Sequence, residues 1–254
     1  MVDSATENPQ AESIHDDDIL PSGDTSQRRR HFRWYDVLVI LLFFFLSQGI
    51  GAFIAVSLGI TPPDPSLLTD SDFEIVENAE SQQARFVAIT FAFAIVICFT
   101  ALTLYRILRK WQSHITFRSP SWGAPFRLLC GYLLLWCVNI TLEPLTSTLP
   151  SDQSALGAGG WLLLSAVVLA PLLEEVVFRG YIASGIQYAY GPIAAWITSS
   201  IIFGIAHGTA GPAVNATFCG FVLGFFYMRY RSLTLVIMLH AMNNLTACFL
   251  ATLN

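Results

Sequence analysis

Seven apolar segments, separated by short polar ones, follow one another along most of the chain. They cover residues 37–60, 84–104, 126–142, 161–184, 191–207, 213–228 and 233–252. A helix needs about 20 predominantly apolar residues to cross the hydrocarbon layer of a membrane. The pattern therefore predicts an all-α fold: a polytopic transmembrane helix bundle of about seven spans.

The composition points to the same class of protein. The chain has 254 residues, of which 54% are hydrophobic and 12% are charged, whereas soluble domains carry about 25% charged residues. We therefore expect an integral, multi-pass membrane protein whose main partner is the lipid bilayer, in the cytoplasmic membrane if the host is bacterial. Basic residues cluster only in the loops beside the helices, so nothing supports binding to nucleic acid. The five cysteines lie in apolar segments without CxxC spacing, which argues against disulfides and against a cysteine zinc site.

The first 33 residues differ from the rest of the chain. Residues 1–27 are acidic and contain no Lys or Arg, and arginines at positions 28–30 and 33 then precede the first span. We interpret 1–33 as a disordered acidic tail with a basic juxtamembrane segment, and 34–254 as the transmembrane bundle. A cleaved secretory signal would need a basic stretch at its very start, which this sequence does not have.

The positive residues predict the orientation in the membrane. Cytoplasmic loops carry an excess of Lys and Arg. With the N-terminus in the cytoplasm, twelve of the thirteen Lys and Arg residues fall on the inner side and only Arg85 falls outside. We therefore expect a cytoplasmic N-terminus and, after seven spans, a C-terminus on the opposite side.

Connections between the spans show typical turn and loop residues. We expect a loop over 61–83, which holds three prolines and six acids, and a Gly/Ser-rich turn over 150–160. The pair Glu143–Pro144 is expected to end the third span. The sequence GTAGP at 208–212 predicts a tight break between the fifth and sixth spans.

The fifth and sixth spans are short for membrane helices. Each has about 16 residues, or about 24 Å of helix at 1.5 Å per residue, against a hydrocarbon layer of about 30 Å. The turn that carries His207 is therefore expected to stop inside the protein, below the membrane surface. Gly220 and Gly224 form a small-xxx-small pair, which predicts close contact between the sixth span and another helix.

The fourth span carries charges that a membrane helix rarely tolerates. Its sequence WLLLSAVVLAPLLEEVVFR places Glu174, Glu175 and Arg179 at the end of an apolar run. One charge near the centre of a membrane helix costs about 2.5–3.5 kcal/mol on insertion scales, so several together indicate a use, unless all of them reach the interface. Glu175 and Arg179 are four residues apart and are expected to pair. Glu174 points about 100° away and is left free to act as a general base.

Two later spans each add one histidine. His207 ends the sequence FGIAH, with Phe203 one turn earlier and able to pack on the imidazole. His240 and Asn244 are four residues apart in HAMNN and can present donors to one cavity. Together these residues suit a water-activating hydrolase. Glu174 would take the proton of the water, and His207 would help to hold the water or pass the proton on. His240 with Asn244 would donate to the oxyanion.

The three segments EEVVFR, FGIAH and HAMNN occur in this order on successive predicted spans. In this they resemble the E-E-x-x-x-R, F-x-x-x-H and H-x-x-x-N signatures of the CPBP family, which includes CAAX prenyl proteases and bacterial relatives. The match covers about residues 161–250. The resemblance implies an intramembrane endopeptidase that uses a glutamate-activated water and cuts a membrane-associated or lipidated peptide. It implies catalytic roles for Glu174, His207, His240 and Asn244. The residues that match the second glutamate, the arginine and the phenylalanine would have supporting roles; they are Glu175, Arg179 and Phe203.

Other readings of the same residues stay open at the level of sequence. Two histidines and one glutamate are a sufficient ligand set for catalytic Zn²⁺, although the mechanism above needs no metal and no cofactor. A chain of Glu and His residues can also relay charge in a proton or cation transporter, but no internal repeat supports a transporter. A catalytically silent scaffold that binds a membrane partner is a further alternative. Nothing in the sequence indicates a particular oligomeric state.

Overall fold

The computed structural model describes residues 32–69, 72–111, 123–149 and 159–251, and these form helices and the short connections between them, without any strand. The disordered tail predicted before residue 32 and the turn predicted around 150–158 lie outside the described residues. The fold class expected from the apolar pattern, an all-α bundle, is confirmed.

The helices follow the apolar segments in order. They are α2 (Trp34–Ser57), η2 (Pro65–Thr69), α3 (Phe73–Leu108), α4 (Ala124–Thr146), α5 (Gly160–Leu162), η3 (Leu163–Leu169), α6 (Ala170–Glu175), η4 (Val176–Ala183), α7 (Ser184–Tyr190), α8 (Pro192–Ile205), α9 (Ala210–Tyr230) and α10 (Leu233–Ala251). The elements from α5 to α7 form one continuous helix, in which η3 and η4 are π-helical. Six helices of the described chain are long and apolar enough to cross a membrane, and α8 is a shorter apolar helix. The protein is an integral, multi-pass membrane protein.

Three predicted boundaries are wrong. Residues 73–83, predicted as loop, form the first three turns of α3, because the side chain of Asp72 caps the helix by accepting from the backbone N–H of Glu74. Pro144 lies inside α4 and does not end it, since the helix continues to Thr146. The break after His207 is shorter than expected, because α9 already begins at Ala210 and is 21 residues long. Helix α8 has only 14 residues, as its short apolar segment indicated.

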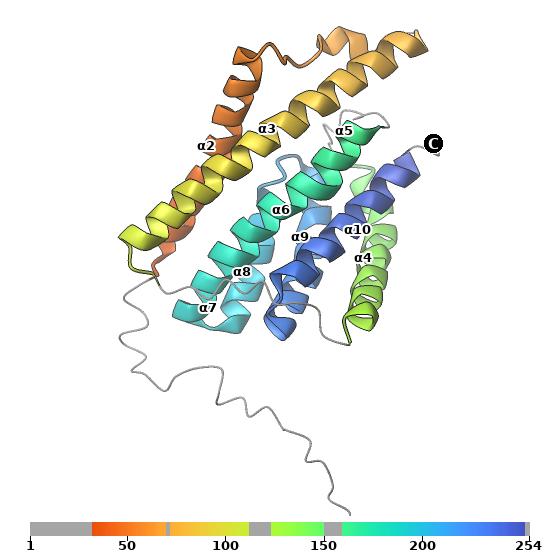
Figure 1. Cartoon of the computed structure of the whole chain (residues 1–254). Coiled ribbons are helices and arrows are strands. Elements are labelled where there is room, and N and C mark those ends of the chain that lie inside the picture. Colours follow the sequence, from red (N-terminus) through yellow and green to blue (C-terminus); the bar gives the residue numbers. More distant parts are fainter. Residues whose placement is uncertain (1–31, 70–71, 112–122, 150–158, 252–254) are drawn as a thin grey trace, which may run out of the picture.

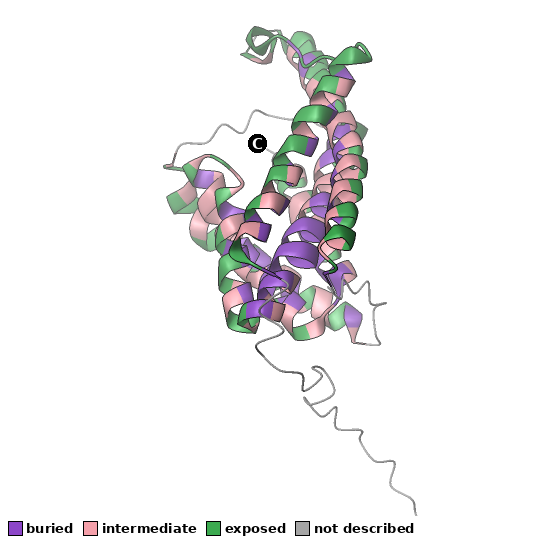
Figure 2. Cartoon of the chain, turned by 90° about the vertical axis from the view of Figure 1, so that its left-hand side faces the viewer, coloured by how far each residue is buried: buried purple, intermediate pink, exposed green. Residues whose placement is uncertain are grey.

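Figure 1 shows α2 and α3 as a hairpin whose connected end extends beyond the other helices. Figure 2 shows that the buried residues concentrate in the half of the bundle away from that end. Every residue of η4 is buried, so this segment is the centre of the core. The helix that carries the two adjacent glutamates is therefore enclosed by the rest of the bundle.

Helices α2 and α3 are in contact along their length. At one end Asp36 is almost fully buried, accepts a hydrogen bond from the hydroxyl of Tyr105 and lies 3.4 Å from Nε of Arg109. Further along, a Cβ added at Gly51 would lie 2.5 Å from the carbonyl oxygen of Thr90, so the two backbones touch there. The absence of a side chain at Gly51 allows this approach.

Helices α8 and α9 also pack backbone against backbone. A Cβ at Gly204 would lie 2.7 Å from the carbonyl oxygen of Ala213, and one at Gly220 would lie 3.2 Å from the carbonyl oxygen of Ser200. A Cβ at Gly224 would meet Trp196 at 2.8 Å. The close contact expected from Gly220 and Gly224 is confirmed, and it makes α8, α9 and the turn between them one unit.

Replacing Gly51 by Ala should destabilise the protein, because the added methyl group meets backbone that has no room to move. Overpacking of this kind costs about 1–3 kcal/mol. Gly49 is the matched control, since nothing lies within 4 Å of a Cβ built there. We expect the melting temperature of the purified protein in detergent to fall for Gly51→Ala and to stay level or rise for Gly49→Ala. Equal melting temperatures for the two variants would contradict the close approach.

Candidate active site

Glu174 and Glu175 lie on α6, a six-residue α-helical segment between the π-helical segments η3 and η4. Short π-helical stretches within α-helices occur frequently at functional sites, because they change the direction of side chains and leave carbonyl groups without their usual donor. The two carboxylates are therefore presented by the irregular part of an otherwise continuous membrane helix.

Pro171 explains why one carbonyl group of η3 has no hydrogen-bond donor within its own helix. The N–H of Ala170 donates to the carbonyl of Ser165, five residues earlier. In that register the next donor would be the N–H of residue 171, which a proline lacks. The carbonyl of Ala166 is thus left without a helical partner, and it accepts a hydrogen bond of 2.8 Å from Nδ2 of Asn244 on α10.

Arg179 and Glu175 form the ion pair that their spacing predicted. Nη1 of Arg179 lies 3.1 Å from Oε1 of Glu175, and both side chains are completely buried. Nη2 of the same arginine donates to the carbonyl of Gly220 on α9 at 3.2 Å, and its guanidinium carbon lies 4.3 Å from the ring centre of Phe203. The arginine therefore connects η4 to both α8 and α9.

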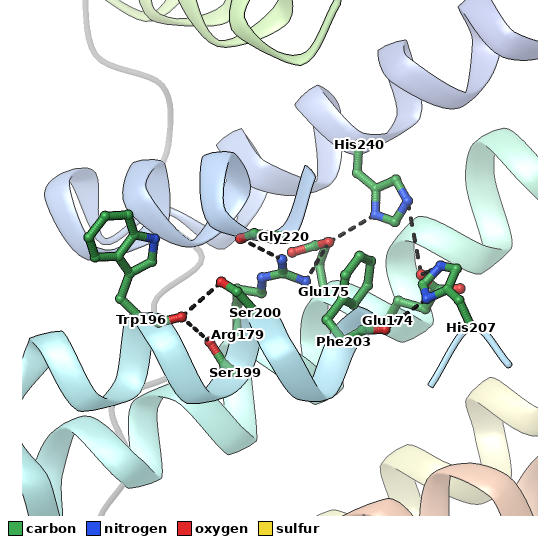
Figure 3. Close-up of polar contacts among 10 residues, drawn as sticks. All are labelled: Glu174, Glu175, Arg179, Trp196, Ser199, Ser200, Phe203, His207, Gly220 and His240. Atoms are coloured by element: carbon green, nitrogen blue, oxygen red, sulfur yellow. Dashed lines mark hydrogen bonds and ion pairs between the residues drawn. The ribbon is translucent and has the colours of Figure 1, made fainter. Parts of the chain in front are cut away.

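His240 uses the same glutamate oxygen. Its Nδ1 lies 2.8 Å from Oε1 of Glu175, and since a carboxylate paired with an arginine accepts hydrogen bonds, Nδ1 is the donor. The other ring nitrogen, Nε2, is then turned toward Glu174, with 3.9 Å between Nε2 and Oε2. Glu175 thus holds Arg179 on one side and orients His240 on the other (Figure 3).

His207 is oriented by the backbone of the preceding helix, α8. Its Nδ1 lies 2.8 Å from the carbonyl oxygen of Phe203. A carbonyl oxygen can only accept, so Nδ1 carries the proton and Nε2 presents a lone pair. That Nε2 lies 4.0 Å from Oε2 of Glu174. The ring of Phe203 packs edge-on against His207 and His240, with centroid distances of 4.7 and 5.8 Å.

Glu174 lies between the two imidazoles, as Figure 3 shows. Its Oε2 is buried and has no hydrogen-bond partner among the described residues. The side chain is 15% exposed, and those of His207 and His240 are 30% and 8% exposed. The structure therefore brings together, from three helices, the glutamate and the two histidines that the sequence singled out.

Asn244 lies one turn after His240, and its observed hydrogen bond goes to η3. The sequence predicted that Asn244 and His240 present donors to one cavity. In the structure both donate to the continuous helix from α5 to α7, His240 to Glu175 and Asn244 to Ala166. One of the two N–H groups of the amide remains for a further acceptor. The link to Ala166 was not foreseen, although a proline inside an apolar helix was a visible signal for it.

A catalytic Zn²⁺, which the sequence left open, would need these side chains to lie closer together than they do. Donor atoms around a tetrahedral Zn²⁺ with bonds of about 2.0–2.1 Å lie about 3.3 Å apart, whereas the two nitrogen–oxygen separations here are 3.9 and 4.0 Å. No group of three His, Cys, Asp or Glu side chains in the described part of the chain is placed to hold a metal ion.

Comparison with known proteins covers the part of the chain that carries this cluster. Residues 157–246 match the family described as Type II CAAX prenyl endopeptidase Rce1-like. The resemblance suggested by the three signatures is thereby confirmed over this stretch, which includes all four candidate catalytic residues.

A curated relative agrees with the Rce1-like match. The chain is 30% identical over 83 residues to "Putative membrane peptidase YdiL" of Bacillus subtilis (strain 168). This alignment covers 33% of the chain and 34% of the relative, so the chain spans about a third of the length of the relative that it matches. No solved structure matches the chain.

Replacing Glu175 by Gln should destabilise the protein much more than replacing Glu174 by Gln. The first change leaves Arg179 and His240 without their buried acceptor charge, and breaking a buried ion pair costs about 3–5 kcal/mol. The second removes a carboxylate whose Oε2 has no hydrogen bond to any residue that the structure describes. Thermal unfolding of both variants in the same detergent measures the difference. A smaller loss for Glu175→Gln than for Glu174→Gln would contradict the pairing.

Asn244 and Pro171 should be energetically coupled. Asn244→Ala leaves the carbonyl of Ala166 unpaired, at a cost of about 1–3 kcal/mol. Pro171→Ala supplies a backbone N–H that can donate to that carbonyl instead. We therefore expect Asn244→Ala to lower the melting temperature less in a Pro171→Ala background than in the wild type. Strict additivity in this double-mutant cycle would mean that the two residues do not share the carbonyl of Ala166.

Proposed function

We propose that this protein is an intramembrane endopeptidase that hydrolyses a peptide bond of a membrane-anchored or prenylated substrate with a water activated by Glu174. The observation that carries the proposal is the position of Oε2 of Glu174, buried, without a hydrogen-bond partner in the described chain and 3.9–4.0 Å from Nε2 of both His207 and His240. The Rce1-like match and the membrane peptidase relative support a peptidase.

The first step is the activation of water. Separations near 4 Å are too long for direct hydrogen bonds but suit one water molecule between the side chains. Such a water donates one proton to Glu174 and the other to the lone pair of His207. Glu174 takes its proton as the water oxygen bonds to the carbonyl carbon of the substrate, and the carbonyl oxygen becomes an oxyanion.

The oxyanion needs hydrogen-bond donors. Asn244 has one N–H left besides the one given to Ala166, and His240 can donate from Nε2 when that nitrogen carries a proton. Glu175, which accepts from Nδ1, stabilises the positive charge that this second proton brings. A donor of this kind contributes about 3–4 kcal/mol to stabilising the transition state.

The intermediate then collapses to products. The carbon–nitrogen bond breaks, and the proton held by Glu174 passes to the departing nitrogen, which leaves as an amine. The new carboxylate carries the oxygen of the water. No step involves a covalent bond to the protein, in keeping with the lack of Ser or Cys in the three signature segments, and none requires a cofactor.

The substrate class follows from the place of the cluster within the bundle. The glutamates and histidines lie on helices that are apolar enough to cross a membrane or, for His207, directly after the short α8. A peptide can reach them only if it is held at the membrane, by its own transmembrane segment or by a lipid. We therefore propose a membrane-associated or lipidated peptide as the partner.

Glu174→Gln should abolish cleavage, because it keeps the shape of the side chain but removes the base. General-base catalysis contributes about 10²–10⁴-fold to rate, so kcat should fall by at least that factor. The assay uses purified protein with a prenylated peptide and with an unmodified membrane peptide. The control is Glu143→Gln, an exposed glutamate near the end of α4.

Two outcomes would overturn parts of this mechanism. Cleavage by Glu174→Gln at the wild-type rate would remove Glu174 as the base. Activity that is lost with a chelator and restored by Zn²⁺ would replace the metal-free mechanism. We expect cleavage that resists the chelator. With every peptide that the wild-type protein cuts, we expect cleavage to require Glu174.

A further inference from the structure

Three asparagines from three helices form a hydrogen-bonded network beside α10. Nδ2 of Asn139 on α4 donates to Oδ1 of Asn243 on α10 at 2.8 Å. Nδ2 of Asn215 on α9 donates to Oδ1 of Asn139 at 2.9 Å. All three side chains are half-buried. Asn243 lies within the segment HAMNN, but none of the three asparagines is a candidate catalytic residue. The proposed mechanism uses none of them.

Asn139 is the centre of this network. Its second N–H donates to the carbonyl of Leu135 at 2.9 Å, so both of its amide protons are used. Its oxygen accepts from Asn215 and also lies 4.0 Å from the thiol of Cys219. Turning the amide over would place its oxygen against the carbonyl of Leu135, where neither atom can donate. The directions of the hydrogen bonds are therefore fixed.

The network lies on a face of α10 next to the one that carries the candidate active site. Successive residues of a helix point about 100° apart. Asn243 therefore points toward α4 while the next residue, Asn244, reaches Ala166 on η3. Helix α10 is held on one face by the carboxamide network and on the adjacent face by Glu175 and Ala166.

Through α9, the same network is connected to the turn that carries the other histidine. Asn215 lies five residues after the start of α9, and the turn before α9 carries His207. Helices α8 and α9 touch backbone to backbone at Gly204, so the turn moves with α9. Asn139 thus connects the helix of His240 to the unit that carries His207.

We propose that Asn139, Asn215 and Asn243 are positioning residues, which hold α10 and the α8–α9 unit at the rotation where both histidines face Glu174. This inference rests on the proposed function for its effect on rate, but the geometry it describes exists without it. Hydrogen bonds between membrane helices contribute only about 0.6–2 kcal/mol each. Small displacements of catalytic groups are more costly, since an error of about 1 Å can reduce rate about 10²-fold.

Asn139→Leu tests the proposal, because leucine has similar size and removes every hydrogen bond of the network that passes through residue 139. We expect kcat to fall by about 10- to 100-fold with little change in KM, at a temperature well below the melting temperature. Thr246→Val is the matched control. It removes the hydrogen bond of 2.8 Å between Tyr132 and Thr246, which joins the same two helices outside the network, and should leave kcat unchanged.

A second measurement does not depend on activity. The rate at which diethylpyrocarbonate modifies His240, read by mass spectrometry, reports the exposure of that imidazole, which is nearly buried in the wild type. We expect a several-fold increase in Asn139→Leu and none in Thr246→Val. If Asn139→Leu does not yield folded protein, Asn215→Ala, which removes only the connection to α9, is measured in the same two assays, with His207 as the reporter.

The outcomes separate the two proposals. Wild-type protein that cleaves neither peptide, together with increased His240 modification in Asn139→Leu, would overturn the proposed function and support the positioning network. An active wild type with unchanged kcat and unchanged modification in Asn139→Leu would overturn the network. Equal losses of kcat in Asn139→Leu and Thr246→Val would also overturn it, because general packing of α4 against α10 would then be the cause.

Discussion

One carboxylate oxygen, Oε1 of Glu175, accepts from both Arg179 and His240 in the fully buried centre of the bundle. A buried charge without partners is expensive, so each of these three residues fixes the other two. Arg179 extends the connection to α9 through the carbonyl of Gly220, and His240 extends it to α10. The neighbouring Glu174 faces the imidazoles, and its Oε2 has no hydrogen-bond partner in the described part of the chain.

The irregular helix between Gly160 and Tyr190 supplies a second constraint. A regular helix satisfies its own carbonyl groups, but the register before Pro171 leaves the carbonyl of Ala166 to be satisfied by Asn244. Helix α10 is therefore connected to this helix at two points one turn apart, through His240 and Asn244. Both contacts come from residues that the mechanism uses. The side chains that hold α10 in place are therefore the same ones that are proposed to act in catalysis.

The apolar pattern was sufficient to predict the bundle and most of its helices, since the membrane imposes the length and polarity of each span. It did not predict the first turns of α3, where polar and acidic residues form a helix that Asp72 caps. The pair of Glu175 and Arg179 could be predicted because it depends only on spacing within one helix. The contact between His240 and Glu175 joins residues 65 positions apart, and the contact of Asn244 depends on a π-helical register, so neither follows from spacing. The orientation in the membrane, the division at residue 33 and the catalytic roles remain predictions.

A double-mutant cycle with Glu175→Gln and His240→Gln, measured by thermal unfolding, tests the central contact most directly. Residues that share a buried network show coupling energies of about 0.5–3 kcal/mol. We expect the double variant to be less destabilised than the sum of the single variants by an amount in this range. Losses that add to within about 0.3–0.5 kcal/mol, as they do for distant sites, would contradict a direct bond between Glu175 and His240 and with it the geometry on which the site depends.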